Sequence, residues 1–232
     1  MKLPLFIWTG VSVTPSNWLL NNLISYYDME SWIDIHWSNN FTLSWSSTVS
    51  GKIWNAQSFD WINDWWTALD NADLRLTWSY TLSMWYKSKD NSATNHRILV
   101  KDDATDYNNW YWLRQNAWNL YYSHFPASWS VADDWNTWVS VTLNTYHHIG
   151  ITFNSTTNAL KIYKDWSLSN SKTASGSIWS NTLTLYLARY SWGQYSNMEF
   201  DEFGIWNTEK NSTDISNLYN WWAWLAYANF TT

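Results

Sequence analysis

His148-Ile149-Gly150-Ile151-Thr152-Phe153 is the stretch that decides the fold, because its large apolar side chains recur at every second residue. A β-strand points successive side chains to opposite sides, so Ile149, Ile151 and Phe153 would share one face. This alternation is typical of a half-buried strand and does not fit the 3.6-residue period of a helix.

The same alternation recurs on both sides of this stretch, at intervals of about 10–15 residues. Residues 80–86, 160–162 and 183–187 are clear examples, and Asn, Asp and Ser bound them. Regularly spaced short strands of this kind indicate two packed antiparallel sheets.

One segment near the C-terminus follows helical spacing instead. In residues 211–219, either Ser212 or Thr213 can serve as the N-cap. The apolar face would consist of Ile215, Leu218 and Tyr219. The sequence therefore predicts an all-β, two-sheet antiparallel sandwich with one short C-terminal helix.

Composition excludes several classes of function. The 232 residues include 13 Lys and Arg against 19 Asp and Glu, a formal net charge of −6, so the basic face of a nucleic-acid binder is absent. There is no Cys, which excludes disulfides, thiolate metal ligands and cysteine nucleophiles. No uninterrupted apolar run reaches the length of a membrane span. Residues 1–7 resemble a secretory signal, but the apolar run is too short and Pro4 interrupts it, so no signal peptide is expected.

Six segments along the chain carry recognisable motifs, one after another. They are LISYYDME (23–30), GKIWNAQSFDWIND (51–64), SYTLSMW (79–85), YHHIGITF (146–153), LKIYKDWSL (160–168) and FDEFGIWN (200–207). Together they resemble the laminin-G-like, concanavalin A-like jelly-roll family. The resemblance implies two curved antiparallel sheets packed face to face, in agreement with the alternation. We expect one jelly-roll domain over residues 21–232, after an irregular lead-in over residues 1–20.

Tryptophan is in large excess over glycine. The chain has 24 Trp and 6 Gly, whereas an average chain contains about 7% Gly. Several tryptophans stand where the family has a turn glycine: Trp54, Trp61, Trp166 and Trp221. We hypothesise that the gene comes from a lineage, or a virus of one, that decodes UGA as glycine; the alternative is a Trp-rich surface for sugar stacking. We take Trp85, Trp138 and Trp206 as genuine, because the family accepts aromatic residues there.

Two carboxylates near the end of the chain invite a catalytic interpretation. Laminarinase-type glucanases of the same superfamily carry E-x-D-x-x-E on one strand, and Glu199 and Asp201 match its first two positions. The third position is Gly204, so the proton donor of a retaining glycosidase is missing. A glycoside hydrolase is therefore only the third choice of function.

The same strand also suggests a structural calcium ion. In related jelly rolls an Asp near this strand holds Ca²⁺ together with backbone carbonyls, and hard oxygen ligands suit that ion. The resemblance implies Asp201 as a ligand, with Asp28 and Asp60 as partners. The alternative is that Asp201 and Glu202 only cap turns or make hydrogen bonds at the strand end.

Two adjacent histidines, His147 and His148, fall within an expected strand. Their side chains would point to opposite faces, so they cannot chelate one ion together. We expect at least one of them to be a core or hydrogen-bonded histidine.

An aromatic and polar segment is the main candidate for ligand binding. Residues 102–112 and the later pair Tyr121-Tyr122 combine rings with amides and carboxylates. Sugars present apolar faces and hydroxyl edges, which such residues recognise. The alternative is that alternate members, such as Tyr111 and Leu113, fill the core. The candidate ligand-binding residues are Asp106, Tyr107, Asn109, Trp110 and Tyr121.

These observations predict a non-catalytic carbohydrate- or surface-recognition module. The expected partner is a glycan or a glycosylated surface, and the expected location is extracellular or on a virion surface. A structural or adhesive component of a phage virion or a cell surface is the alternative, since the fold alone does not determine the function.

Overall fold

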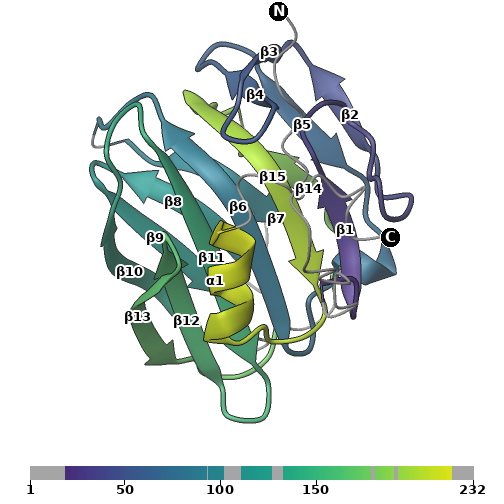
Figure 1. Ribbon diagram of the computed structural model, residues 1–232, viewed down its shortest axis with the longest axis vertical. Coiled ribbons are helices and arrows are strands. Elements are labelled where there is room, and N and C mark those ends of the chain that lie inside the picture. Colours follow the sequence, from purple (N-terminus) through teal and green to yellow (C-terminus); the bar gives the residue numbers. More distant parts are fainter. Residues whose placement is uncertain are drawn as a thin grey trace, which may run out of the picture.

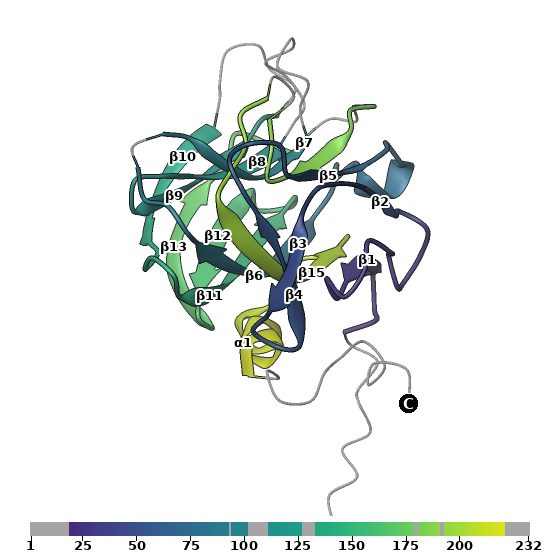
Figure 2. The same ribbon diagram turned by 90° about the horizontal axis from the view of Figure 1, so that it is seen from above.

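A computed structural model describes residues 19–92, 94–101, 111–126, 133–178, 181–190 and 193–220. Within these ranges the chain forms two antiparallel sheets that lie face to face, as Figure 2 shows. The expected all-β jelly-roll sandwich with one short C-terminal helix is confirmed.

The first sheet has eight strands in the order β13-β12-β11-β6-β15-β4-β3, and β1 pairs with β15 as well. Its strands are β1 (Leu23–Tyr27), β3 (Ser47–Ser50), β4 (Asn55–Phe59), β6 (Tyr80–Ser88), β11 (Tyr146–Asn154), β12 (Ala159–Lys164), β13 (Ser167–Thr173) and β15 (Met198–Trp206). The helix α1 (Ser212–Asn220) lies on the outer side of this sheet, in front of β6 and β11 in Figure 1.

The second sheet has seven strands in the order β10-β9-β8-β7-β14-β5-β2. Its strands are β2 (Phe41–Ser44), β5 (Trp65–Ala68), β7 (His96–Lys101), β8 (Tyr111–Asn116), β9 (Asn119–His124), β10 (Asp133–Ser140) and β14 (Leu185–Leu187). A 3₁₀ turn (Ala72–Leu74) lies between β5 and β6.

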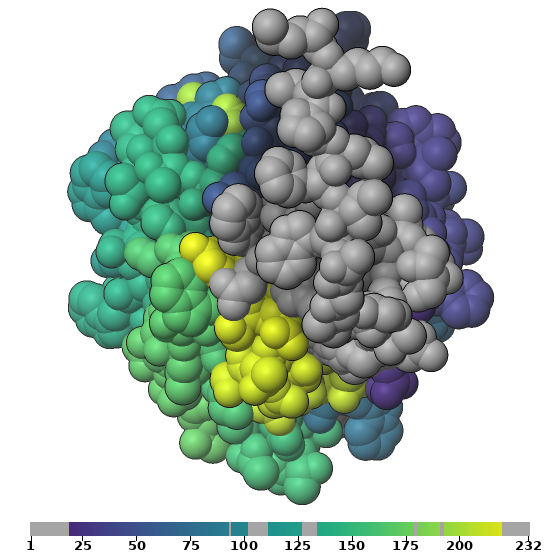
Figure 3. Space-filling model, in the orientation of Figure 1, coloured from purple at the N-terminus to yellow at the C-terminus, as the bar shows by residue number. Residues whose placement is uncertain are grey.

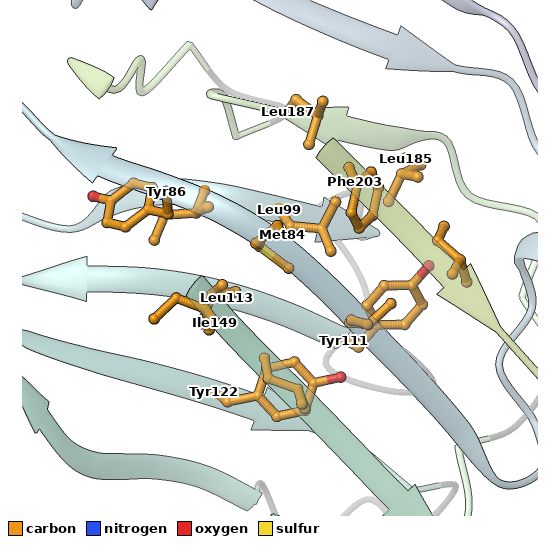
Figure 4. Packing of buried hydrophobic residues seen from close by; sticks show 14 of the residues in the cluster. Met84, Tyr86, Leu99, Tyr111, Leu113, Tyr122, Ile149, Leu185, Leu187 and Phe203 are labelled. Carbon is orange, nitrogen blue, oxygen red and sulfur yellow. The ribbon is translucent and has the colours of Figure 1, made fainter. Parts of the chain in front are cut away.

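The core fills the space between the two sheets. In Figure 4, Met84 and Ile149 of the first sheet lie close to Leu99 and Leu113 of the second. The expected alternation in β11 is confirmed, because Ile149, Ile151 and Phe153 all lie in this core.

The other face of β11 is buried as well, which alternation alone does not predict. His148 is nearly inaccessible, and Ile215 of α1 packs over Gly150, where an added Cβ would lie 3.3 Å from the Ile215 side chain. In Figure 3, α1 (yellow) forms part of the molecular surface beside the strands β11–β13 (green). The helix therefore turns a half-buried strand into one that is covered on both sides.

The helix cap differs from the expectation. The Oδ1 atom of Asn211 accepts hydrogen bonds from the backbone N–H groups of Thr213 (2.8 Å) and Asp214 (3.0 Å). Asp214 Oδ2 accepts from the Asn211 N–H (3.0 Å), which completes a reciprocal capping arrangement. The prediction of Ser212 or Thr213 as the N-cap was therefore wrong by one or two residues.

The expected turn glycines are occupied by bulky rings with different backbone geometries. Asp165 and Trp166 form the two-residue turn between β12 and β13, with φ of 48° and 69°. Such turns strongly prefer Asn-Gly or Asp-Gly. Trp61 and Trp54 stand in turns without positive φ, and both are exposed. Trp221 lies outside the described residues.

The three tryptophans that we expected to be genuine also differ from one another. Trp85 and Trp206 are buried, and Trp206 Nε1 donates a hydrogen bond to the Leu19 carbonyl (2.6 Å). Trp138 has φ of 56° in a bulge of β10, and 74% of it is exposed. The geometry of Trp138 therefore resembles that of Trp166 rather than that of the buried pair.

No helix among the described residues has the length and apolarity that crossing a bilayer requires.

Candidate ligand-binding face and acidic turn

The outer side of the seven-stranded sheet carries a row of polar and aromatic residues. Arg97, Arg114, Tyr121 and Asn136 are successive partners across β7, β8, β9 and β10. A β-bulge between Arg97 and Leu99 shifts the alternation, so Arg97 points outward while Leu99 enters the core. We name this row, with the adjacent Asp134, the arginine face.

Arg114 is the best-connected residue of the arginine face. Its Nη1 donates to Asn95 Oδ1 and its Nη2 to Asp134 Oδ2, both at 2.7 Å. Its guanidinium lies 4.1 Å from the centre of the Tyr121 ring. The Tyr121 hydroxyl in turn accepts a hydrogen bond from Asn136 Nδ2 (3.0 Å). The Tyr121 ring is therefore fixed at both ends.

Arg97 lies between two rings. Its guanidinium is 3.8 Å from the centre of the Trp112 ring and 4.8 Å from that of Tyr190. Contacts of this kind contribute about 0.5–2 kcal/mol each, more when they are desolvated. Arg97 is buried, so this stack packs both rings against the sheet.

A third arginine, Arg189, extends the same arrangement along the sheet. It follows β14, and its guanidinium lies 4.6 Å from the centre of the Trp65 ring. The rings of Tyr195 (5.6 Å) and Tyr186 (5.9 Å) are also within reach. Three arginines interleaved with aromatic rings thus cross one surface of the sandwich.

The predicted ligand residues fall partly on this surface. Tyr121 is half-buried and belongs to the arginine face, while Tyr111 and Leu113 fill the core, as the alternative interpretation held. Asp106, Tyr107, Asn109 and Trp110 lie outside the described residues, in the segment that joins β7 to β8.

Sequence reasoning missed the arginines themselves. Trp112 and Arg114 alternate with the core residues of β8, and this spacing was a usable signal. The bulge at Arg97 was not visible in the sequence, because strict alternation places that residue in the core.

A second polar cluster lies in the middle of β15, on the other sheet. The strand bulges between Asp201 and Gly204, and Glu202 has φ of 49°. The bulge breaks strict alternation, so Asp201 and Glu202 both lie beside the loop 51–55. Together with Asp28 and Glu30 they form what we name the acidic turn.

Asp201 is fully buried in the acidic turn. Its Oδ2 accepts hydrogen bonds from the N–H groups of Lys52 (2.8 Å) and Ile53 (3.1 Å). Its Oδ1 is buried and makes no hydrogen bond within the described part of the chain. Burial raises the pKa of Asp201 to about 7, although the two N–H donors lower it. A buried carboxylate oxygen without a hydrogen-bond partner lowers the stability of the folded protein unless a proton or a cation binds to it.

The other carboxylates surround a small pocket. Its volume is about 370 Å³. Asp28, Glu30, Trp54, Asn55 and Glu202 line it. Burial, followed by the charge of Asp201, raises the pKa of Glu202, whose Oε2 accepts a hydrogen bond from the Tyr26 hydroxyl. Burial also raises the pKa of Asp28.

Of the three predicted calcium ligands, the structure brings Asp201 and Asp28 to the same cluster. Asp60 lies in a separate turn, where its Oδ1 accepts from the N–H groups of Ile62 (2.8 Å) and Asn63 (3.2 Å). Among the described residues, no three His, Asp or Glu side chains converge closely enough to hold an ion as they stand. The acidic turn nevertheless offers oxygen donors alone, which is the chemistry that Ca²⁺ prefers.

The geometry around Glu199 does not resemble a glycosidase centre. Glu199 Oε2 pairs with Lys87 Nζ (2.7 Å) and accepts a hydrogen bond from the Tyr146 hydroxyl (2.8 Å). At Gly204, where the glucanase motif has its second glutamate, an added Cβ would overlap the Trp206 ring. The third position of the motif therefore has no room for a side chain.

Both histidines of β11 are hydrogen-bonded. His147 Nδ1 pairs with Asp165 Oδ2 (2.8 Å), while His148 Nε2 contacts Ser83 Oγ (2.8 Å). Burial lowers the pKa of His148 to about 4, so it is neutral at pH 7.

The family model Laminin_G_3, described as the concanavalin A-like lectin/glucanases superfamily, matches residues 63–216. The chain belongs to this superfamily. A search of the curated proteins finds no match.

Solved structures share the superfamily fold at low sequence identity. The binding domain of Paraclostridial mosquitocidal protein 1 superposes with a TM-score of 0.73 at 16% identity, over 87% of this chain and 52% of that one. Domain 4 of the GH43 arabinanase AbnA from Geobacillus stearothermophilus, in complex with arabinotriose, gives 0.67 at 17% identity, over 85% and 98%. The binding domain of botulinum neurotoxin DC in complex with SialylT gives 0.69 at 13% identity, over 89% and 53%. The chain thus spans about half the length of the toxin domains, and the likeness shows the fold alone.

Proposed function

We propose that the chain is a non-catalytic carbohydrate-recognition module and that the arginine face is its binding surface. The observation that carries this proposal is the fixed row of Arg114, Tyr121 and Asn136. A ring held by a stacked guanidinium and a hydrogen bond is pre-organised, so little conformational entropy is lost on binding.

The chemistry of this surface suits sugars. Tyr121, Trp112 and Tyr190 offer ring faces for the apolar side of a pyranose. Beside them, the Asp134 carboxylate, whose side chain is 40% exposed, offers acceptor oxygens to hydroxyl groups. We also retain Asp106, Tyr107, Asn109 and Trp110, which join β7 to β8 in the sequence, as proposed ligand residues.

Structures of similar fold support this choice. Domain 4 of the arabinanase was solved with arabinotriose, and the neurotoxin binding domain was solved with SialylT. The missing third carboxylate at Gly204 favours binding over hydrolysis.

The test is a glycan array followed by calorimetry on the glycans that bind. Tyr121→Ala should weaken binding about 5- to 150-fold if a sugar stacks on this ring as strongly as a nucleic-acid base stacks on an aromatic side chain, about 1–3 kcal/mol. Leu168→Ala, an exposed apolar truncation on β13 of the other sheet, is the matched control and should leave affinity unchanged. If no glycan binds, or if both variants bind like the parent, this function is wrong.

We further propose that the acidic turn holds a structural Ca²⁺, with Asp201 as its principal side-chain ligand and Asp28 as a partner. The orphaned Oδ1 atom of Asp201 is the observation that supports it. A bound Ca²⁺ would supply the positive charge that the buried carboxylates lack. Asp60, which is occupied in its own turn, is left out of this site.

Calcium should raise the melting temperature of protein treated with EDTA. Binding at 100 times the dissociation constant contributes about 2.7 kcal/mol, which shifts the melting temperature by several degrees. Asp201→Asn should abolish the shift, while Asp60→Asn should retain it. The same shift in Asp201→Asn, or none in the parent protein, would exclude Asp201 as a calcium ligand.

A further inference from the structure

The segment that joins β6 to β7 carries side chains with metal-binding chemistry at every second residue. They are Asp90, Ser92, Thr94 and His96, the last of which is the first residue of β7. Only 3% of His96 is exposed, whereas Thr94 is open to solvent. We name these four side chains the Asp-His cluster. It belongs neither to the arginine face nor to the acidic turn.

Four atoms of the Asp-His cluster lie close to one another. Asp90 Oδ2 is 2.7 Å from Ser92 Oγ and 2.9 Å from His96 Nε2. Ser92 Oγ is 3.1 Å from His96 Nε2 and 2.8 Å from Thr94 Oγ1. Thr94 Oγ1 is also 3.1 Å from His96 Nε2. The four atoms therefore form two triangles that share the edge from Ser92 to His96.

The Asp-His cluster has too few hydrogen atoms for these five short distances. Each of the two hydroxyl groups supplies one hydrogen, and the imidazole supplies at most one at Nε2. At most three of the five distances can therefore be ordinary two-centre hydrogen bonds. In the others, lone pairs face each other or two acceptors share one hydrogen. A cation bound to the lone pairs of all four atoms would remove this deficit.

The spacing of the four atoms also suits a metal ion. In octahedral coordination with bonds of about 2.1 Å, neighbouring ligand atoms lie about 3.0 Å apart. The observed range of 2.7 to 3.1 Å includes this value. Because Thr94 is exposed, water can complete the coordination shell on that side.

The backbone around the Asp-His cluster is held in place by its neighbours. The Asp90 carbonyl accepts hydrogen bonds from Ser88 Oγ (2.7 Å) and Gln115 Nε2 (3.1 Å). The Ser92 carbonyl accepts from the N–H group of Ala117 (3.1 Å), in the turn between β8 and β9. Asp90 Oδ1 accepts from the Ser92 N–H group (3.0 Å), which directs Oδ2 to the cluster. A segment fixed in this way loses little conformational entropy when it binds an ion.

The donor atoms indicate the class of ion. Burial lowers the pKa of His96, although the charge of Asp90 acts in the opposite direction, so the imidazole is neutral at pH 7 and able to bind a metal. Carboxylate and other oxygen ligands suit hard ions such as Mg²⁺, Ca²⁺ and Mn²⁺, whereas imidazole suits transition metals. Mn²⁺ is the ion that meets both requirements.

We propose that Asp90, Ser92, Thr94 and His96 bind a divalent transition-metal ion, for which Mn²⁺ is the best match. Asp90 supplies the one negative charge, His96 the nitrogen ligand, and the two hydroxyl groups the remaining oxygen ligands. This site is independent of sugar binding and of the proposed calcium ion at Asp201.

The experiment titrates the EDTA-treated full chain with MnCl₂ and follows free Mn²⁺ by electron paramagnetic resonance. His96→Gln should weaken Mn²⁺ binding at least about tenfold, since loss of even an outer-shell partner of a metal ligand costs about 10–100-fold in affinity. Ser92→Ala with Thr94→Ala should weaken it as well, and this double variant serves if His96→Gln does not fold. Asp201→Asn should bind Mn²⁺ at this site as the parent protein does.

A second histidine paired with an aspartate provides the matched control. His147 Nδ1 lies 2.8 Å from Asp165 Oδ2 on the eight-stranded sheet. His147→Gln should therefore leave Mn²⁺ binding unchanged. Bound Mn²⁺ should also broaden the imidazole NMR signals of His96 far more than those of His147, with the two variants giving the assignments. A purely structural role of His96 would produce no such broadening.

Two results would overturn this inference. If the parent protein binds no Mn²⁺, or if His96→Gln and the double variant both bind it like the parent, hydrogen bonds alone hold this segment. If Asp201→Asn abolishes binding and the His96 signals stay sharp, the ion binds at the acidic turn instead. Neither result bears on the proposed recognition of sugars.

Discussion

At the scale of single residues, the backbone angle φ separates two sets of tryptophans within the part of the chain that the structure describes. Trp85 and Trp206 are buried at regular positions of β6 and β15, where large rings are needed. Trp45, Trp138 and Trp166 have φ between 53° and 69°, a region that side chains with a Cβ rarely adopt. The three tryptophans with positive φ fit our hypothesis that the native host translates these codons as glycine. That hypothesis stays a prediction.

Trp166 gives the sharpest test of this hypothesis. Trp166→Gly should stabilise the protein by about 1 kcal/mol in urea unfolding, because positive φ strains residues other than glycine. The loss of the contact with Tyr219, whose ring centre is 4.6 Å away, reduces this gain. Trp206→Gly is the control, and it should destabilise by about 3 kcal/mol or more because it empties a buried site.

The intact mass of protein from the native host tests the recoding hypothesis independently of any stability measurement. A mass that matches 24 Trp would contradict recoding, whatever the two variants do.

At the scale of elements, the contact between α1 and the eight-stranded sheet contains a buried titratable group. His148 lies under the helix, with the Tyr219 ring centre at 6.1 Å and the Trp85 ring centre at 5.3 Å. Burial lowers its pKa from 6.5 to about 4, although the charge of the neighbouring Asp165 acts in the opposite direction. Because no positive charge is accommodated there, protonation must loosen this packing.

The contact between helix and sheet should therefore make stability depend on pH. The unfolded chain takes up the His148 proton near pH 6.5 and the folded chain near pH 4, so stability is fully present above the first value and is lost as the pH falls towards the second. The loss is at most about 3 kcal/mol, since one pKa unit corresponds to about 1.4 kcal/mol.

Urea unfolding between pH 7.5 and 4 measures this slope. His148→Gln should flatten it, whereas Ser83→Ala keeps the imidazole and should keep the slope. An unchanged slope in His148→Gln would show that other groups cause the dependence.

At the scale of the whole molecule, the two sheets are joined by a buried polar link as well as by apolar packing. The Tyr80 hydroxyl on β6 lies 2.7 Å from that of Tyr122 and 2.9 Å from His124 Nδ1, both on β9. His124 Nε2 lies 2.6 Å from the carbonyl oxygen of Gly176 and must donate to it, so Nδ1 accepts from Tyr80. The link fixes how the two sheets are aligned.

Removing the Tyr80 hydroxyl should lower the free energy of unfolding more than removing the Tyr122 hydroxyl. Tyr80→Phe leaves the Tyr122 hydroxyl and His124 Nδ1 without this partner, and should destabilise by about 1–3 kcal/mol. Tyr122→Phe removes only the hydroxyl that donates to Tyr80, and it should lower the free energy of unfolding by less. The two variants and the double variant are compared by urea unfolding, and equal costs for the single variants would contradict this arrangement.

Much of the fold was determined by the sequence alone, because the period of apolar residues is a local property. The strands at 80–86 and 146–153, the two-sheet class and the C-terminal helix were all predicted correctly. The helix cap was misplaced, since Asn211, Ser212 and Thr213 are all good caps and only the hydrogen bonds distinguish them.

Only the tertiary structure decided which residues meet across strands. Arg97, Arg114 and Arg189 are far apart in sequence, and strand order with the bulge at Arg97 brings them to one face. Asp201 and Asp28 both lie near Glu202, while Asp60 is held in a separate turn. Register and bulges depend on contacts between distant segments, so a one-dimensional pattern determines the elements and leaves their surfaces undetermined.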